Sequence, residues 1–210
     1  MKVFVGYDTR EDMAYQVCKH SILRHSPTAE VKPLKQNDLK RQGWYSRSED
    51  KLASTEFTFT RFLVPELRTD IAELFAQADD TKAVMCVQHD YAPKEAMKMD
   101  GQRQTVYPRK NWSSMMLINC GHPANKRLNI DLVNEKELNG AYFHRFSWLE
   151  SDDLIGEISP EWNWLVGHYE EPKDGTPKLL HYTEGGPWFE NYRDCDYNQE
   201  WKQELYDMFK

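Results

Sequence analysis

The sequence lacks the marks of several broad classes of protein. No apolar run approaches the length needed to cross a bilayer, and Met1 to Gly6 contains no long targeting segment. The four cysteines are scattered without a Cys-x-x-Cys pair, which suits reduced thiols and argues against a cysteine zinc site. A net charge of −7 argues against a broad electrostatic grip on nucleic acid. We therefore expect a cytoplasmic protein that neither spans a membrane nor binds nucleic acid.

The composition is that of an ordinary globular domain. The 210 residues fit one domain, and a hydrophobic share of 40% is enough for a packed core. No internal repeat, low-complexity tract or dividing linker interrupts residues 1–210, so we expect a single domain. Aromatic residues make up 13% of the chain and could fill the core or line a sugar or base pocket, with burial the commoner use of a large ring.

The order of apolar patterns predicts a strand, a helix and a second strand at the start of the chain, which favours an α/β sheet. Further strands are expected at three apolar runs, and further helices where apolar residues recur at helical spacing. Residues 36–55 are polar and predict a long loop of the kind that often forms a lid. The expected strands are 3–7, 29–34, 82–88, 115–120 and 178–182, and the expected helices are 11–23, 58–64, 71–78, 123–139 and 197–209.

Several polar residues follow or flank these elements. Asp8 comes directly after the first strand, where open α/β sheets bind ligands, although a helix cap is an equally good interpretation. Arg61 stands among Phe59, Phe62 and Leu63, where a buried guanidinium would need an anion; the alternative is a surface arginine whose stem covers apolar neighbours. His89-Asp90-Tyr91 closes an apolar strand and predicts either a site or the cap of a turn.

Two later segments also contain candidate site residues. Asp152 and Asp153 form an acidic pair of the kind that sugar chemistry uses near an oxocarbenium-like centre, although an acid-rich helix start explains the pair as well. His181 ends a short apolar run and precedes Gly185 and Gly186. A histidine beside bare backbone amides can bind a metal or a phosphate, whereas a lone histidine is more often structural.

Taken in order, these segments resemble the family 8, glycogenin-like glycosyltransferases. The resemblance covers most of the chain. It involves the first strand and its helix, the helix of the donor-contacting arginine, and the start of a later strand. It also involves an acidic segment and a motif like His-x-x-Gly-x-x-Lys-Pro-Trp. The matching segments are Val3 to Asp8 with His20 to Leu23, Ser54 to Pro65, Asn111 to Asn119, Asp152 to Ile155 with Trp162-Asn163, and His181 to Trp188.

The resemblance implies an A-type nucleotide-sugar transferase fold, with a mixed, mostly parallel central sheet flanked by helices. It also implies retaining transfer of a sugar from a nucleoside-diphosphate donor, with UDP as the expected nucleotide, to a glycan or other hydroxyl acceptor. Mn²⁺, or Mg²⁺, would bridge the diphosphate and offset charge on the leaving group. The implied roles are nucleoside contact for Gly6, Tyr7 and Asp8, donor contact for Arg61, metal ligation for His181, and a place facing the reacting sugar for Asp152 and Asp153.

The chain departs from the family pattern at three places, the first being Ser113-Ser114 in place of the family's small-Gly pair, on the acceptor side. Gly186 stands where the family has a lysine, so another cation, or the amides of Gly185 and Gly186, would have to bind the phosphate. The metal-binding Asp-x-Asp is missing from its expected position, which is the abrupt junction between Leu67 and Asp70. Either the sequence omits an internal segment or the protein truly lacks that strand, and an intact-mass measurement separates the two. True absence would favour a non-catalytic nucleotide- or glycan-binding relative.

Overall fold

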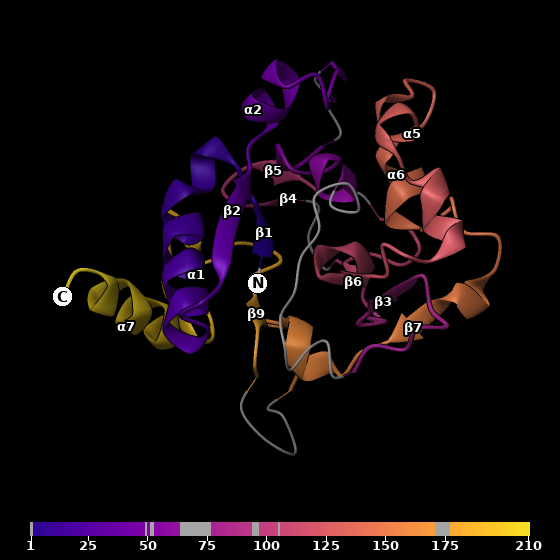
Figure 1. The fold of residues 1–210 in the computed structure, drawn as a ribbon. Helices are drawn as coiled ribbons and strands as arrows, with labels where there is room; N and C mark the ends of the chain where they lie inside the picture. The colour runs from indigo at the N-terminus through magenta and orange to yellow at the C-terminus, as the bar shows by residue number, and fades with distance from the viewer. Residues whose placement is uncertain are drawn as a thin grey trace.

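The computed structural model describes residues 2–48, 50, 53–63, 77–93, 97–104, 106–170 and 177–210, and it is a mixed α/β structure (Figure 1). The strands in these ranges form four small sheets, with the orders β1-β2, β6-β3-β7, β4-β5 and β8-β9. Parallel and antiparallel pairs are both present. The mixed α/β class is therefore confirmed, whereas a single A-type central sheet stays a prediction.

The first sheet and the last helix lie on one side of the molecule (Figure 1). Strand β1 (Lys2–Gly6) pairs in parallel with β2 (Glu30–Leu34), and α1 (Asp12–His25) connects them. Helix α7 (Asn198–Met208) packs on α1, where Glu204 Oε1 lies 2.6 Å from His20 Nδ1 and Glu204 Oε2 lies 2.6 Å from Arg24 Nη2. Of these elements, β1 lies nearest the middle of the molecule in Figure 1.

The three-stranded sheet is the centre of the core. Strand β3 (Val84–Cys86) lies between β6 (Met116–Ile118), which is antiparallel to it, and β7 (Ile155–Glu157), which is parallel. Val84 and Cys86 face one hydrophobic cluster, and Met85 faces the other. Burial on both faces explains why β3 reads as an uninterrupted apolar run in the sequence.

Two short sheets bring distant segments together. Strands β4 (Met97–Lys98) and β5 (Gln102–Arg103) form an antiparallel hairpin whose turn includes Gly101 at φ 123°. Strand β8 (Trp164–Leu165) pairs in parallel with β9 (Leu180–His181), so that Leu165 is opposite His181. The Met99 N–H donates to the Glu184 carbonyl over 2.7 Å, which fixes the hairpin against the segment that follows β9.

The remaining helices are short and lie mostly around the central sheet. They comprise α2 (Gln36–Arg41), α5 (Ile130–Asn134) and α6 (Gly140–His144), with 3₁₀ turns at Thr9–Glu11, Thr60–Leu63, Trp112–Ser114, Pro123–Arg127, Asp152–Leu154, Pro160–Asn163 and Glu190–Tyr192. Asn129 and Asn139 cap α5 and α6 by accepting from the backbone N–H groups of Leu132 and Tyr142.

The five predicted strands and the two terminal helices are confirmed, and every strand except β1 is shorter than predicted. The prediction of a loop is wrong over Gln36–Arg41, which form α2, and Tyr45 in the same polar stretch is 3% exposed. The predicted helix over 123–139 is instead a 3₁₀ turn followed by α5, because Asn129 starts a new helix there. The predicted helix over 58–64 is a turn and a short 3₁₀ helix as far as it is described. The Leu67–Asp70 junction lies outside the described residues, and so does the predicted helix over 71–78 except for residues 77 and 78.

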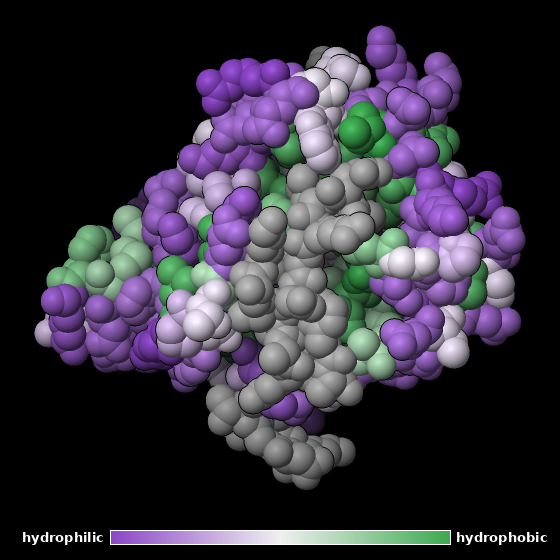
Figure 2. Space-filling model, viewed as in Figure 1, coloured by the Kyte–Doolittle hydropathy of each residue, from purple (hydrophilic) through white to green (hydrophobic). Residues whose placement is uncertain are grey.

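The face of the molecule in Figure 2 is mostly hydrophilic, with apolar atoms showing between polar ones and over α7. Two large apolar side chains near the C-terminus, Tyr206 and Phe209, are 62% and 75% exposed. Within the described ranges, no helix combines the length and the apolar character needed to cross a bilayer.

Candidate functional site

Arg61 is a cation enclosed by the fold. Its Nε donates to the Phe57 carbonyl over 3.1 Å, and its Nη1 donates to the Ser113 carbonyl over 3.0 Å. Desolvation lowers the pKa of Arg61 to about 10, and no described carboxylate forms an ion pair with it. The guanidinium therefore stays charged at neutral pH, and its partners among the described residues are two carbonyl oxygens and the Phe57 ring, whose centroid lies 4.8 Å from Arg61 Cζ. A buried cation of this kind favours a nearby anion.

The surroundings of Arg61 add positive charge. Ser113 Oγ and His144 Nδ1 form a hydrogen bond of 2.6 Å. The Tyr107 ring stacks on His144 with 5.5 Å between centroids. Burial lowers the pKa of His144 well below its usual value, and the charges of Arg61, Lys110 and Lys98 lower it further. Burial likewise lowers the pKa of Lys110 to about 8. Several cations thus act on one enclosed region of a chain whose net charge is −7.

His181 lies in the same electrostatic region. Burial lowers its pKa to about 3, with smaller contributions from Lys98, His89, Arg61 and His168. Its imidazole is therefore neutral at physiological pH, and its buried Nδ1 has no hydrogen-bond partner among the described residues. An unpaired nitrogen of a neutral histidine can accept a proton or coordinate a metal. The structure brings His181 and Arg61 into one region, although 119 residues separate them in the sequence and they lie on different elements.

A hydrogen-bonded chain of polar side chains joins the segments around this region. Asn163, which is 1% exposed, donates from Nδ2 to Ser114 Oγ over 2.8 Å and lies 2.9 Å from His89 Nε2. As oriented, the Asn163 amide makes His89 Nε2 the acceptor, so His89 Nδ1 bears the proton and donates to Tyr169 Oη at 2.5 Å. Burial lowers the pKa of His89 to about 4, in keeping with a neutral ring.

A second link reaches the loop after β9. Asn111 Nδ2 donates to Thr183 Oγ1 over 3.0 Å, and Thr183 donates its N–H to the His181 carbonyl over 3.0 Å. Asn111 has a φ of 68°, a left-handed backbone conformation that asparagine adopts more readily than most residues. The motif asparagines Asn111 and Asn163 therefore connect the β6 segment, His89 and the His181 loop into one framework.

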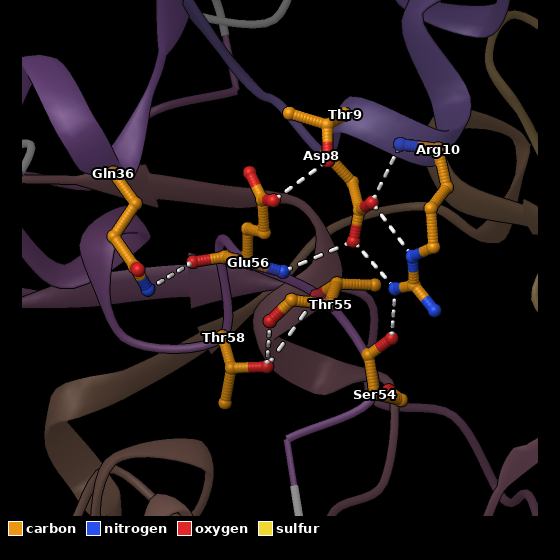
Figure 3. Close-up of polar contacts among 8 residues, drawn as sticks. All are labelled: Asp8, Thr9, Arg10, Gln36, Ser54, Thr55, Glu56 and Thr58. Carbon is orange, nitrogen blue, oxygen red and sulfur yellow. Dashed lines mark hydrogen bonds and ion pairs between the residues drawn. The ribbon is translucent and has the colours of Figure 1, made fainter. Parts of the chain in front are cut away.

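Asp8 organises the turn after β1 (Figure 3). Its Oδ1 accepts from the N–H and Nε of Arg10, both at 2.9 Å, and its Oδ2 accepts from Arg10 Nη2 at 2.6 Å and from the Glu56 N–H at 3.1 Å. These four donors match the acceptor capacity of a carboxylate. The Asp8 side chain is 0% exposed, so the geometry favours the capping interpretation, and its contact with a nucleoside stays a prediction.

Gly6 and Tyr7 complete the end of β1. A Cβ on Gly6 would lie 2.5 Å from the Phe57 ring, so this glycine lets the Arg61 segment approach the strand closely. The Tyr7 hydroxyl donates to Asp12 Oδ1 over 2.8 Å, and the Lys35 ammonium lies 4.4 Å from the centroid of the Tyr7 ring. The structure thus joins Gly6 and Arg61 through Phe57.

Glu11 extends the site from the Asp8 turn toward His181. Burial and the charge of Asp8 raise its pKa to about 7, while Arg10, the Trp188 indole and Lys98 act in the opposite direction. Glu11 Oε1 and Trp188 Nε1 are both buried, and neither has a partner with hydrogen-bond geometry among the described residues. Glu11 and Trp188 thus lie near enough for the indole to lower the pKa of the carboxyl, whereas His181 Nδ1 has no described partner. Nothing in the local sequence of Glu11 marked it as buried.

Gly185 and Gly186 lie against aromatic rings. A Cβ on Gly185 would be 2.7 Å from the Tyr192 ring, and one on Gly186 would be 2.1 Å from the Trp188 ring. Gly185 also has a φ of 146°, which disfavours any other residue. No described group accepts a hydrogen bond from either glycine N–H. Both amides therefore remain candidates for binding a phosphate.

Asp152 and Asp153 lie elsewhere. They form the 3₁₀ turn before β7, with Ser151 as the cap, and Lys82 Nζ donates to the Asp153 carbonyl over 2.8 Å. Because β3 and β7 are parallel, this turn is at the amino ends of the strands, whereas His89 follows the carboxyl end of β3. Asp152 is 79% exposed on its side chain and pairs with Arg109 at 2.5 Å. The structure does not bring the two acids together with His181, and their role stays a prediction.

The residues present fit a metal in part. Neutral His181 with an unpaired Nδ1 suits one coordination position. Across the described ranges, however, no group of three or more His, Cys, Asp and Glu side chains is arranged to hold an ion. The Leu67–Asp70 junction, where the family resemblance places an Asp-x-Asp that this sequence lacks, lies outside those ranges.

One relative among known proteins places the chain in a family. No family model matches the chain, and no solved structure matches it. Protein CDI of Arabidopsis thaliana is 50% identical over 224 residues, which cover 97% of this chain and 85% of the relative. The chain belongs to the family of Protein CDI. The match is longer than the 210 residues of this chain, so the relative has residues within the matched region that lack a counterpart here. Such residues agree both with a segment omitted from the sequence and with a strand that the protein lacks.

Proposed function

We propose that the protein is a retaining glycosyltransferase that moves a sugar from a nucleoside-diphosphate donor, UDP-sugar by expectation, to a glycan or other hydroxyl acceptor. The observation that supports this best is the convergence of Arg61 and His181. The partly buried guanidinium of Arg61, which has no described carboxylate partner, contributes to the low pKa of His181, whose Nδ1 is unpaired among the described residues. Diphosphate is an anion that suits both groups, because a planar guanidinium binds two oxygens at once.

The chemistry asked of these residues is stabilisation of the leaving group. When the bond between the sugar and the diphosphate breaks, negative charge increases on the phosphate oxygens. Arg61 would donate hydrogen bonds to those oxygens from a partly buried position, where each interaction is stronger than in water. The amides of Gly185 and Gly186 would add neutral donors to the same phosphate oxygens. A bound Mn²⁺ or Mg²⁺ would supply Lewis-acid chemistry, and His181 is the described residue that would hold it.

Donor turnover tests this proposal. The 210-residue chain, its intact mass verified, is incubated with UDP-, GDP- and ADP-sugars in Mn²⁺, in Mg²⁺ and in EDTA, and the released nucleoside diphosphate is quantified by chromatography. We expect release from a UDP-sugar that needs the metal. Replacement of Arg61 by methionine should lower the rate at least about a hundredfold, as loss of a leaving-group donor does in other enzymes. Absence of release from every donor by protein that remains folded would refute glycosyl transfer.

A second candidate is a non-catalytic nucleotide- or glycan-binding protein. It is favoured by the missing Asp-x-Asp in the sequence and by the lack of a three-ligand metal group among the described residues. It predicts UDP binding that EDTA does not change, with no release of nucleotide from any sugar donor.

A further inference from the structure

The β4–β5 hairpin places a lysine against the loop in which the motif lysine is missing. Lys98 Nζ donates to the Thr183 carbonyl over 3.3 Å, and the next residue, Met99, donates its N–H to the Glu184 carbonyl over 2.7 Å. Two contacts therefore hold the end of β4 on Thr183 and Glu184, directly before Gly185. Gly186 is the position where a lysine was expected from the resemblance.

Lys98 lacks a neutralising anion within the part of the chain that the structure describes. No described carboxylate forms an ion pair with its ammonium, and the long hydrogen bond to a neutral carbonyl is its one contact among the described residues. Glu11 and Glu184 influence it from a longer distance, and Arg61 and Arg10 oppose them. Since a buried ammonium without a partner is costly, this arrangement favours an anion that arrives from outside.

The groups near Lys98 indicate where that anion would bind. The charges of Lys98 and Arg61 both act on His181, whose buried Nδ1 has no hydrogen-bond partner among the described residues. Trp188 Nε1, also buried, lies on the segment that follows Gly186 and acts on the Glu11 carboxyl. The amides of Gly185 and Gly186 add two N–H donors that no described group uses.

The other side of the loop does not suit an anion. A cavity of about 230 Å³ lies beside Gly185, and the side chains of Glu184, Asp194 and Asp196 line it. Three carboxylates repel phosphate, so a phosphate group at this loop is directed to the side of Lys98 and His181.

We infer that Lys98 binds the phosphate groups of the donor diphosphate, in place of the lysine that this chain replaces with Gly186. Lys98 would act as a point charge that rotates toward the phosphate, while Arg61 supplies a planar pair of donors. The cation thus comes from a hairpin more than 80 residues earlier in the chain rather than from the motif itself. The assignment rests on the proposed function for the identity of the ligand, but it can be tested by binding without turnover.

The test measures affinity with isothermal titration calorimetry, using UDP, inorganic pyrophosphate and uridine as probes. The variants are Lys98→Met, which removes the charge at similar length, and Lys98→Arg, which retains it. Lys82→Met is the matched control, because Lys82 also donates to a single carbonyl, that of Asp153, at the amino ends of β3 and β7. Thermal melts verify folding, and Lys98→Met should melt no lower than the parent, because it removes a buried unpaired charge.

We expect Lys98→Met to weaken UDP and pyrophosphate binding roughly tenfold to a hundredfold, as loss of a charged hydrogen bond does, and to leave any binding of uridine unchanged. Lys98→Arg should recover most of the affinity, and Lys82→Met should match the parent. Unchanged pyrophosphate affinity in folded Lys98→Met would overturn the inference. Turnover of a UDP-sugar that is insensitive to Lys98→Met would refute the inference alone, whereas Lys98-dependent pyrophosphate binding without any turnover would support it and refute glycosyl transfer.

Discussion

Replacing Glu11 with glutamine should change stability in a way that depends on pH. Burial and Asp8 raise the pKa of Glu11 from 4.5 to about 7, so the carboxyl is harder to ionise in the folded protein than in the unfolded chain. Below pH 4.5 the group is protonated in both states and contributes nothing. As pH rises through the window from 4.5 to 7, the folded state binds more protons than the unfolded state, and the free energy of unfolding falls.

The magnitude follows from the size of the shift. Each pKa unit corresponds to about 1.4 kcal/mol, so ionising Glu11 in the folded state costs at most about 3 kcal/mol above pH 7. The Glu11→Gln variant lacks this cost. Its free energy of unfolding, relative to the parent, should therefore increase from pH 4.5 to 7 and remain constant above pH 7.

Urea unfolding at pH 5, 6, 7 and 8, followed by circular dichroism, measures this difference. Glu137→Gln is the control, because Glu137 is exposed and its replacement reports the general effect of removing one negative charge from a chain of net charge −7. A difference between Glu11→Gln and the parent that stays flat across the four pH values, after subtraction of the control, would refute the burial of Glu11 beside Asp8.

Four further outcomes are expected. Since the Glu11 carboxylate interacts with Lys98, UDP affinity should fall as pH rises through 7 in the parent and fall less in Glu11→Gln, as calorimetry at pH 6 and 8 would detect. Asn163→Leu removes the hydrogen bonds to His89 and Ser114, and should lower the free energy of unfolding by about 1–3 kcal/mol in urea titrations; an unchanged value would contradict the network. Gly186→Ala forces a Cβ against the Trp188 ring and should cost about 1–3 kcal/mol of stability, with a fluorescence change of the indole. Asp152→Asn should leave UDP affinity within about twofold of the parent by calorimetry, because the Asp152 side chain is exposed at the opposite end of β7.

The elements with strong local patterns could be predicted from the sequence. Strand β3 is an apolar run because it is buried on both faces, and α1 and α7 are periodic because each buries one side. Short or composite elements gave no such signal. The two-residue strand β4 has no measurable period, and α5 is separated from the preceding 3₁₀ turn by Asn129 rather than by a change in composition.

The sequence indicated individual site residues better than it indicated the contacts between them. Arg61 and His181 were marked by apolar neighbours and by the glycines that follow, and the structure places them in one region. Lys98 and Glu11 were missed, because their burial arises from contacts with Thr183 and Trp188, far along the chain. Asp8 was weighed evenly between cap and ligand, and its four protein donors depend on Arg10 and Glu56, which local sequence could not assign.

A crystal structure of the protein with UDP bound is the most direct test of the central claim, that this region holds a nucleoside diphosphate. The account predicts phosphate oxygens within hydrogen-bond distance, about 2.7–3.2 Å, of an Arg61 nitrogen and of Lys98 Nζ, with His181 facing the same group. A well-ordered UDP bound elsewhere on the protein, with Arg61 and Lys98 contacting none of its phosphates, would contradict the account.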